Sequence, residues 1–281
     1  MILFNIAIKN LFGAKLRTSL NVFVTSVSFF LVIFVSGMYD GMREHAKNIT
    51  IETEIAGGTY WHPEYDPMDP RTFEYSHSIM PPKIKRLIDQ KHAFGVLVSQ
   101  ASIYPNGRIM PAIMKGITPS QTIVNIPTDV LEQDDDITIP VLIGSEMAKN
   151  SNLKIVDSFT IRWLDADRTY DADEGTIVHV METENFKLDQ GHIWIPLSKA
   201  QSMLAMENQA TYVTYAKGLD VIQDTGDWIH HDVDYMIRDM EALIKADEPG
   251  AQVMYSILLA LSLIHISEPT RQAEISYAVF C

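Results

Sequence analysis

Cysteine is almost absent from the sequence, because its 281 residues include only Cys281, at the last position. A single thiol excludes an intrachain disulfide framework and a thiolate metal cluster. Basic residues are also few: 22 Lys and Arg stand against 36 Asp and Glu, for a formal charge of −14. Residues 1–17 contain three basic and no acidic residues, so the acidity belongs to the rest of the chain. Such a chain repels nucleic acid, and we expect no nucleic-acid partner.

Motifs of catalysis and cofactor binding are missing as well. The sequence contains neither G-x-x-x-x-G-K-[ST], which cradles phosphates, nor the H-E-x-x-H of zinc proteases. Gly144-Ser145-Glu146 lacks the second glycine that a G-x-S-x-G nucleophile elbow needs. We therefore expect no catalytic residue and no cofactor, and we interpret the chain as a non-enzyme.

Three clusters of side chains in the sequence could form binding sites. His230–Asp234 offers imidazoles and carboxylates, which suit zinc or iron, but consecutive residues at a helix start cannot all face one ion. We interpret that cluster as an N-capped, solvated helix end. Asp134–Asp136 lacks the spaced oxygen ligands of a calcium loop and is interpreted as a solvated loop. Trp61, His62 and Glu64 could line a pocket, but we expect this aromatic loop to tuck against its own domain. No metal site is expected.

One long apolar run is present. Residues 20–39 (LNVFVTSVSFFLVIFVSGMY) contain no charged residue, and about 20 residues of helix cross the roughly 30 Å of hydrocarbon in a bilayer. Its Ser and Thr hydroxyls can bond back to the helix backbone. A buried helix of a soluble protein is seldom this apolar on every face, and a cleaved signal peptide usually has a shorter core. The run therefore predicts an uncleaved transmembrane helix over 20–39.

The flanks of this run predict its orientation. Lys9, Lys15 and Arg17 precede it, and basic residues mark the cytoplasmic side of a span. We expect residues 1–19 to form an amphipathic elbow on the cytoplasmic membrane surface, in contact with lipid. Gly37 and Gly41 form a G-x-x-x-G at the outer end. That spacing favours either close packing of transmembrane helices or termination of the helix at glycine, and both alternatives stay open.

Residues 40–250 predict an α+β domain of strands with interspersed helices. Asn106-Gly107 is a hairpin signal, Ser198 is a predicted N-cap, and residues 59–70 read as a loop or edge strand. Helices are expected over 43–54, 81–90, 146–151, 198–206 and 232–247. Strands are expected over 95–104, 108–117, 139–143, 158–164, 176–182, 192–196 and 211–215.

Six stretches occur in an order that carries a family resemblance: Asn5–Leu11, Lys15–Leu20, Gly37–Met42, Arg108–Pro119, Val141–Ala148 and Ile193–Gln201. Together they resemble bacterial ABC-transporter permeases of the MacB/LolC/FtsX-like family, in which a basic elbow leads into the first spanning helix. One departure is Val156-Asp157, which stands where that family has Gly-Asp before a strand.

The resemblance implies a permease of the lipoprotein-releasing or macrolide-export type in the bacterial inner membrane, with residues 40–250 as its periplasmic core domain. Such permeases form homo- or heterodimers and bind a separate cytoplasmic ABC ATPase. ATP-driven closure moves the spanning helices, and the periplasmic domain then moves a lipoprotein, peptide or lipid-linked substrate, or pulls on a periplasmic partner. We expect the stalk after Tyr39 and the helix over 232–247 to connect membrane and domain.

The end of the chain changes character. A second span starts over 251–261, but this apolar stretch is too short to cross a bilayer. Residues 262–281 resemble the translation of a sequencing-library adapter, and we hypothesise that the native chain was cut near residue 261. The alternative to a permease fragment is a single-pass membrane sensor or ligand-binding module, and a membrane-anchored hydrolase is a third reading.

Overall fold

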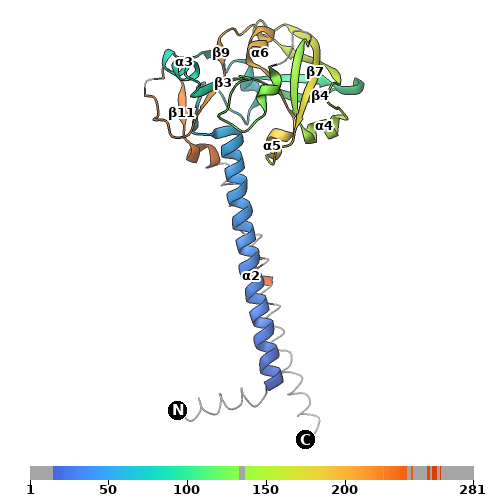
Figure 1. Cartoon of the computed structure of the whole chain (residues 1–281), viewed down its shortest axis with the longest axis vertical. Coiled ribbons are helices and arrows are strands. Elements are labelled where there is room, and N and C mark those ends of the chain that lie inside the picture. The colour runs from blue at the N-terminus through green and yellow to red at the C-terminus, as the bar shows by residue number, and fades with distance from the viewer. Residues whose placement is uncertain are drawn as a thin grey trace. The chain divides into compact units, whose positions relative to one another are not determined.

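The computed structural model describes residues 15–132, 137–223 and 225–238, with residues 242, 252, 253, 255–257 and 260. The chain forms two compact units, Met1–His45 with Asp239–Cys281, and Ala46–Arg238 (Figure 1). The expected second span over 251–261 lies largely outside the described residues, and the expected non-native tail over 262–281 lies wholly outside them.

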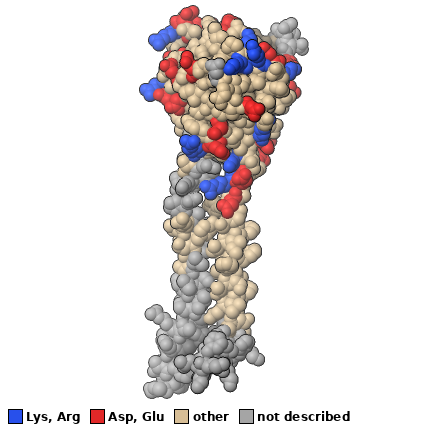
Figure 2. All heavy atoms as spheres, turned by 90° about the vertical axis from the view of Figure 1, so that its left-hand side faces the viewer, with Lys and Arg blue, Asp and Glu red and all other residues tan. Residues whose placement is uncertain are grey.

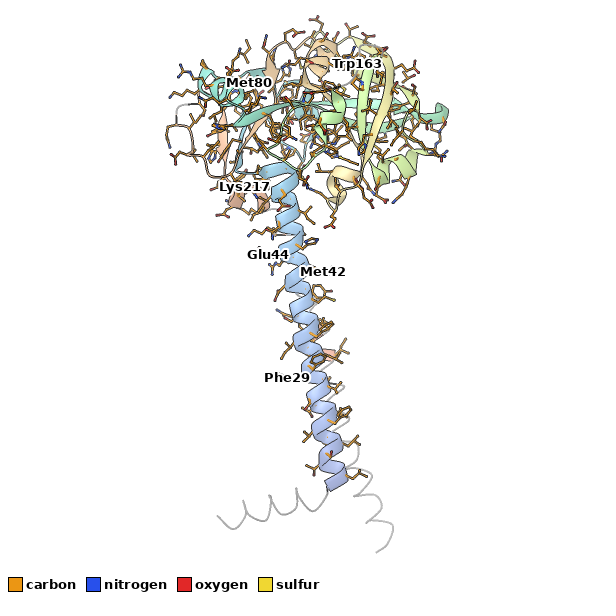
Figure 3. All side chains as sticks on the ribbon, viewed as in Figure 1. Phe29, Met42, Glu44, Met80, Trp163 and Lys217 are labelled. Atoms are coloured by element: carbon orange, nitrogen blue, oxygen red, sulfur yellow. The ribbon has the colours of Figure 1, made fainter. Side chains whose placement is uncertain are left out.

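Helix α2 (Lys15–Thr50) contains the predicted transmembrane run. Among the described residues it belongs to the one helix, Thr18–Ile55, whose length and composition suffice to cross a membrane. Figure 2 shows no Lys, Arg, Asp or Glu atoms along the middle of this helix, on the face in view. Phe29 projects sideways from α2 (Figure 3), and its side chain is 63% exposed within the chain. An apolar surface of this kind is satisfied by lipid or by other helices.

Two hydroxyls within the apolar run of α2 bond back to the helix backbone. The Thr25 hydroxyl donates to the Asn21 carbonyl at 2.8 Å, and the Ser28 hydroxyl donates to the Val24 carbonyl at 2.9 Å. These bonds are the back-bonding that the sequence predicts, and they remove the cost of placing hydroxyls in hydrocarbon.

Gly37 and Gly41 do not end the helix, because α2 continues to Thr50. The alternative of helix termination at these glycines is therefore wrong. A Cβ atom built on either glycine would meet none of the described atoms within 4 Å, so the described part of the chain gives no steric reason for glycine there. Close packing of another helix at Gly37 and Gly41 stays a prediction.

The second unit holds the α+β domain that the sequence predicts. Its helical elements are η1 (Ile51–Ile55), η2 (Pro70–Glu74), α3 (Pro82–Asp89), η3 (Pro105–Gly107), η4 (Thr128–Leu131), α4 (Ser145–Ser151), α5 (Phe186–Asp189), α6 (Leu197–Leu204) and a short helix over 233–238. Its strands are β1 (Gly58–Trp61), β2 (Ser78–Ile79), β3 (Ala93–Tyr104), β4 (Met110–Ile117), β5 (Ile139–Gly144), β6 (Ser158–Leu164), β7 (Tyr170–Met181), β8 (His192–Pro196), β9 (Gln209–Ala210), β10 (Tyr212–Tyr215) and β11 (Ile229–His231).

Nine of these strands form one sheet in the order β11-β1-β10-β3-β4-β8-β5-β7-β6, and β3 pairs additionally with β6. The long strand β3 has different partners at its two ends, which allows part of the sheet to close into a barrel. Its first residues pair with β10, from Ala93 opposite Tyr215 onwards, and its last residues pair with β6, ending with Tyr104 opposite Thr160. The strands β3, β4, β8, β5, β7 and β6 therefore close into a barrel, and β10, β1 and β11 extend from it as a three-stranded wing.

Side chains alternate between two faces along β3, as the two-residue period of a strand requires. Leu97 and Ile103 belong to the cluster inside the barrel, whereas Phe94 and Val98 belong to a second cluster outside it. All six barrel strands contribute to the inner cluster. Trp163 of β6 is one of its members (Figure 3), and its indole N–H donates to the Met203 carbonyl at 2.8 Å.

Several predicted boundaries need correction. β7 begins six residues earlier than predicted, because the exposed segment from Tyr170 pairs with β6 although its sequence does not alternate. Helix α6 begins at Leu197 with Pro196 at the N-cap, so Ser198 is not the cap. The loop expected over 59–70 begins with β1, which pairs on both sides and is not an edge.

Val156 adopts a left-handed backbone conformation, with φ at +77°. It is the third residue of a turn in which the Asp157 N–H donates to the Lys154 carbonyl at 3.0 Å, and its side chain is 77% exposed. A β-branched residue is strained at such a φ, and glycine is not. The position at which the sequence departs from the family's Gly-Asp is therefore one where glycine fits the backbone better.

We expect Val156→Gly to raise the free energy of unfolding by about 1 kcal/mol, because it removes roughly 1–3 kcal/mol of strain while glycine costs about 0.5–1 kcal/mol in chain entropy. Urea unfolding followed by tryptophan fluorescence measures the difference. The neighbouring variant Ile155→Gly is the control, since Ile155 has no positive φ, and it should destabilise the domain. If both variants changed the free energy of unfolding equally, the backbone of Val156 would not be strained.

Candidate functional site

The chain enters the domain through a turn of π-helix. In η1 the Ala56 N–H donates to the Ile51 carbonyl at 2.7 Å, five residues back. Ala56 then takes φ 53° and ψ −108°, which is unusual for a residue other than glycine. The next residue, Gly57, donates its N–H to the Tyr215 carbonyl at 2.9 Å, and a Cβ atom there would lie 2.4 Å from the Ala216 carbonyl oxygen. Glycine at 57 therefore permits the close approach of η1 to β10.

Three successive residues of η1 each bind a different part of the domain. The Glu52 carbonyl accepts from the Asn125 N–H at 2.8 Å. The Thr53 hydroxyl accepts from the Asn185 side-chain amide at 3.1 Å. The Glu54 carboxylate lies 3.6 Å from the Lys115 ammonium. We call these contacts, with the bond from Gly57, the η1 mount.

Lys115 is the most unusual member of the η1 mount. It lies on β4 between Ile113 and Ile117, on the outer face of the barrel, and its side chain is only 8% exposed. Its ammonium lies 4.8 Å from the centre of the Trp194 ring. Burial lowers the pKa of Lys115, and the nearby Glu54 carboxylate partly opposes this by favouring the charged form.

Two tyrosines complete the surroundings of Glu54. The rings of Tyr65 and Tyr212 stack with their centres 5.7 Å apart. Burial raises the pKa of both phenols, and the charge of Glu54 raises them further. Both phenols therefore stay protonated at any physiological pH. The η1 mount surrounds one ion pair, whose lysine is buried and whose carboxylate is 29% exposed, and it is suited to holding η1 in a single position.

The net stability from such a pair is small, because desolvation offsets the attraction between the charges. The ion pair contributes more to specificity than to stability, because it favours one position of η1 over others. A lysine in a dry position accepts one arrangement of the facing carboxylate, and loss of that arrangement leaves a buried charge. The ion pair therefore defines where η1 binds.

The Gly144-Ser145 motif has a structural role. Asp189 is buried and accepts from the Ser145 hydroxyl at 2.9 Å and from the Ser145 N–H at 3.3 Å, so it caps the start of α4. A Cβ atom on Gly144 would lie 2.5 Å from the Asp189 Cα, which explains the glycine. An open hollow of about 420 Å³ adjoins this cap and is lined by Lys149 and acidic side chains, without an imidazole that could activate Ser145.

The residues singled out in the sequence fall in different places. Lys9 lies outside the described residues, and Lys15 and Arg17 lie in the first turn of α2. Asp134–Asp136 also lies outside them. Within the described ranges, no group of three or more His, Cys, Asp or Glu side chains could hold a metal ion.

His230–Asp234 is partly a strand and only then a helix start. His230 and His231 belong to β11 and pair with Tyr60 and Thr59, so the prediction of a helix over 232–247 began at the right place and missed the strand before it. Asp232 is the N-cap, because its carboxylate accepts from the Tyr235 N–H at 2.7 Å. The predicted N-capped helix start is confirmed, but His230 and His231 are half-buried in β11 rather than solvated at a helix end. The predicted helix beyond residue 238 lies largely outside the described residues.

The aromatic loop behaves as predicted, because the Trp61 ring packs against Tyr65 at 5.0 Å and against His231 at 4.5 Å. The η1 mount itself was missed by the sequence reasoning. The available signal was Lys115 in Ile113-x-Lys115-x-Ile117, a charge on the apolar side of an alternating strand. Nothing in the sequence identifies Glu54 as its partner.

Comparison with known proteins finds similarity only among solved structures. No protein-family model and no curated protein matches the chain. Among solved structures, the periplasmic region of MacB from Actinobacillus actinomycetemcomitans is similar, with 11% identity, a TM-score of 0.44, and coverage of 68% of this chain and 95% of that one. The extracellular domain of the noncanonic ABC-type transporter YknZ from Gram-positive bacteria is also similar, with 9% identity, a TM-score of 0.35, and coverage of 58% and 83%. In structure the chain is thus similar to exported domains of MacB and of an ABC-type transporter.

Proposed function

We propose that this chain is a permease component of an ABC transporter in the bacterial inner membrane. Its N-terminus lies in the cytoplasm, residues 20–39 cross the bilayer, and the domain over 40–250 lies in the periplasm. The basic flank of Lys9, Lys15 and Arg17 supports this orientation. The ordered sequence motifs of the MacB/LolC/FtsX-like permeases support the class.

The chain acts without bond chemistry of its own. A separate cytoplasmic ATPase binds it, a second permease copy or homologue pairs with it, and the ATPase drives its spanning helices. The periplasmic domain then displaces a lipoprotein, peptide or lipid-linked substrate.

The η1 mount is the observation that carries this proposal. Motion of a helix reaches a domain only where the helix is fixed to it. Successive residues of η1, directly after α2, bind the Asn125 loop, the Asn185 loop and Lys115 on β4. Three attachments on different elements resist rotation as well as pulling. We infer that the η1 mount transfers displacement of α2 to the barrel.

Co-purification tests the proposal. The full chain, tagged and expressed in its host, is extracted from membranes in mild detergent, and the proteins bound to it are identified. We expect an ABC ATPase in near-stoichiometric amount. The control is the exported domain over 46–238 alone, which lacks the spanning helix and should recover no ATPase. Recovery of a kinase or cyclase instead, or of no ATPase with the full chain, would contradict the proposal.

A further inference from the structure

A second attachment holds the last described part of the domain, residues 225–238, which we call the β11 segment. Among the described strands, β11 pairs with β1 alone, in three residue pairs from Thr59 opposite His231 to Trp61 opposite Ile229. After the strand, the Met236 sulfur accepts from the Thr59 hydroxyl at 3.5 Å, and Ile237 is 2% exposed. A three-residue edge strand with one neighbour is among the least protected kinds of sheet element.

His230 fastens β11 to the wing from one face. Its Nε2 lies 2.9 Å from the Tyr215 hydroxyl, and its ring centre lies 5.2 Å from that of Tyr60. The charged and titratable groups around it are Tyr60 on β1, Tyr215 on β10, and His231 and Asp232 on the same segment. Burial raises the pKa of Tyr215 to about 12, so it stays a neutral phenol. Burial lowers the pKa of His230, and Asp232, the one carboxylate that acts on it among the described residues, only partly offsets this effect.

His231 fastens β11 from the other face. Its ring stacks on Tyr235 with centres 4.1 Å apart and meets the Trp61 ring edge-on at 4.5 Å. The Arg238 guanidinium already lies 5.0 Å from the centre of the same Tyr235 ring. A proton on His231 would therefore bring a second positive charge to the Tyr235 ring that Arg238 already faces, and the two cations would repel each other. Burial, and the neighbouring His230, lower the pKa of His231, while Asp232 opposes them.

His62 lies where the β11 segment begins. It follows β1, and its ring centre lies 6.5 Å from that of Trp228, a residue buried in the core of the wing. The groups acting on it are Glu64 and Asp227, which favour the protonated ring, and His77, which disfavours it. Burial is the largest effect and lowers the pKa of His62.

We propose that these three imidazoles make the attachment of the β11 segment acid-labile, so that mild acid releases residues 225–238 while the barrel stays folded. The inference goes beyond the proposed function and does not depend on it. The β11 segment would then be a pH-sensitive attachment at the C-terminal end of the described domain. The η1 mount differs from it, because the tyrosines of the η1 mount do not titrate in this range.

The direction follows from linkage. Burial lowers the pKa of all three histidines, and each makes ring contacts that depend on attachment of the β11 segment, so we expect the attached state to bind fewer protons than the released state. Attachment is therefore at full strength above the ordinary histidine pKa of about 6.5 and weakens as pH falls through the lowered values.

Cysteine accessibility in the full chain tests the proposal. In a Cys281→Ser background, Ile237→Cys reports on the buried side of the β11 segment, and Asp234→Cys, an exposed site, corrects for the pH dependence of alkylation. Met236→Cys is a second reporter in case Ile237→Cys disturbs folding. We expect the ratio of alkylation at 237 to that at 234 to rise several-fold between pH 7.5 and pH 5.5.

Two controls make the result specific. Ser151→Cys, at a site 1% exposed in α4, should stay protected at both pH values, which shows that the barrel remains folded. Replacing His62, His230 and His231 together with glutamine should make the ratio independent of pH. A flat ratio in the parent chain, equal exposure of residue 151 in acid, or an undiminished rise in the glutamine variant would each overturn the proposal. The readout requires no transport, so it stands apart from the test for an ATPase partner.

Discussion

Glu54→Leu is expected to lower the free energy of unfolding of the domain by about 1–3 kcal/mol, because it leaves the buried Lys115 ammonium without its carboxylate partner. The partner left behind, Lys115, has a side chain only 8% exposed. The reciprocal variant Lys115→Met should cost less, because Glu54 is 29% exposed and can recover water. Urea unfolding followed by tryptophan fluorescence reports on the domain directly, since all four tryptophans of the chain lie in it.

The double variant Glu54→Leu, Lys115→Met completes the comparison. An apolar pair of similar volume is often neutral or better than a buried ion pair, so the double variant should regain most of the lost stability. If the double variant lost as much stability as the two single variants together, the pair would not be the buried contact that the geometry describes. Losses below about 0.5 kcal/mol in both single variants would show the same.

Phe29→Arg is expected to prevent stable insertion of α2 in a membrane. Phe29 lies at the middle of the apolar run over 20–39, where a central arginine costs about 2.5–3.5 kcal/mol on insertion scales. Such a cost shifts a single span from mostly inserted to mostly excluded. Carbonate extraction of membranes from expressing cells measures the inserted fraction.

Phe29→Leu is the matched control, because leucine is at least as favourable as phenylalanine at the centre of a span. It should leave the inserted fraction unchanged. If the arginine variant partitioned like the leucine variant, α2 would not be held by the bilayer, and its exposed apolar surface would need another explanation.

The local structure of this chain was largely predictable, and the reason is periodicity. β8 (His192–Pro196) and β6 (Ser158–Leu164) match their predicted bounds. Each strand has an alternating or continuous apolar pattern, and the sequence on either side marks clearly where that pattern ends. The turn at Asn106 and Gly107 was also predictable, since both residues have positive φ, which Asn and Gly tolerate best.

Elements without hydrophobic periodicity could not be predicted from the sequence. The first half of β7 (Tyr170–Met181) is exposed and rich in acidic residues, so only its partner strand holds it in the sheet. β11 (Ile229–His231) is three residues long, and its pairing with β1 joins segments about 170 residues apart. Such pairings are decided by the whole fold rather than by local sequence.

The same limit applies to the candidate site. The sequence predicts a helical stalk after Tyr39 with a helix over 43–54, and in the structure α2 and η1 together continue to Ile55. It does not predict that Glu54 meets Lys115, because their contact depends on how the barrel closes. The departure at Val156 was visible in the sequence, but its backbone strain was not.

The central claim is that the domain lies outside the cytoplasm while the N-terminus lies inside. In a Cys281→Ser background, one cysteine is placed at the exposed residue Asp167, between β6 and β7, and another, in a separate chain, at Asn10. Intact spheroplasts are treated with a maleimide that cannot cross membranes. The account predicts that the cysteine at 167 reacts at once and the cysteine at 10 reacts only after lysis, whereas labelling at 10 with protection at 167 would contradict it.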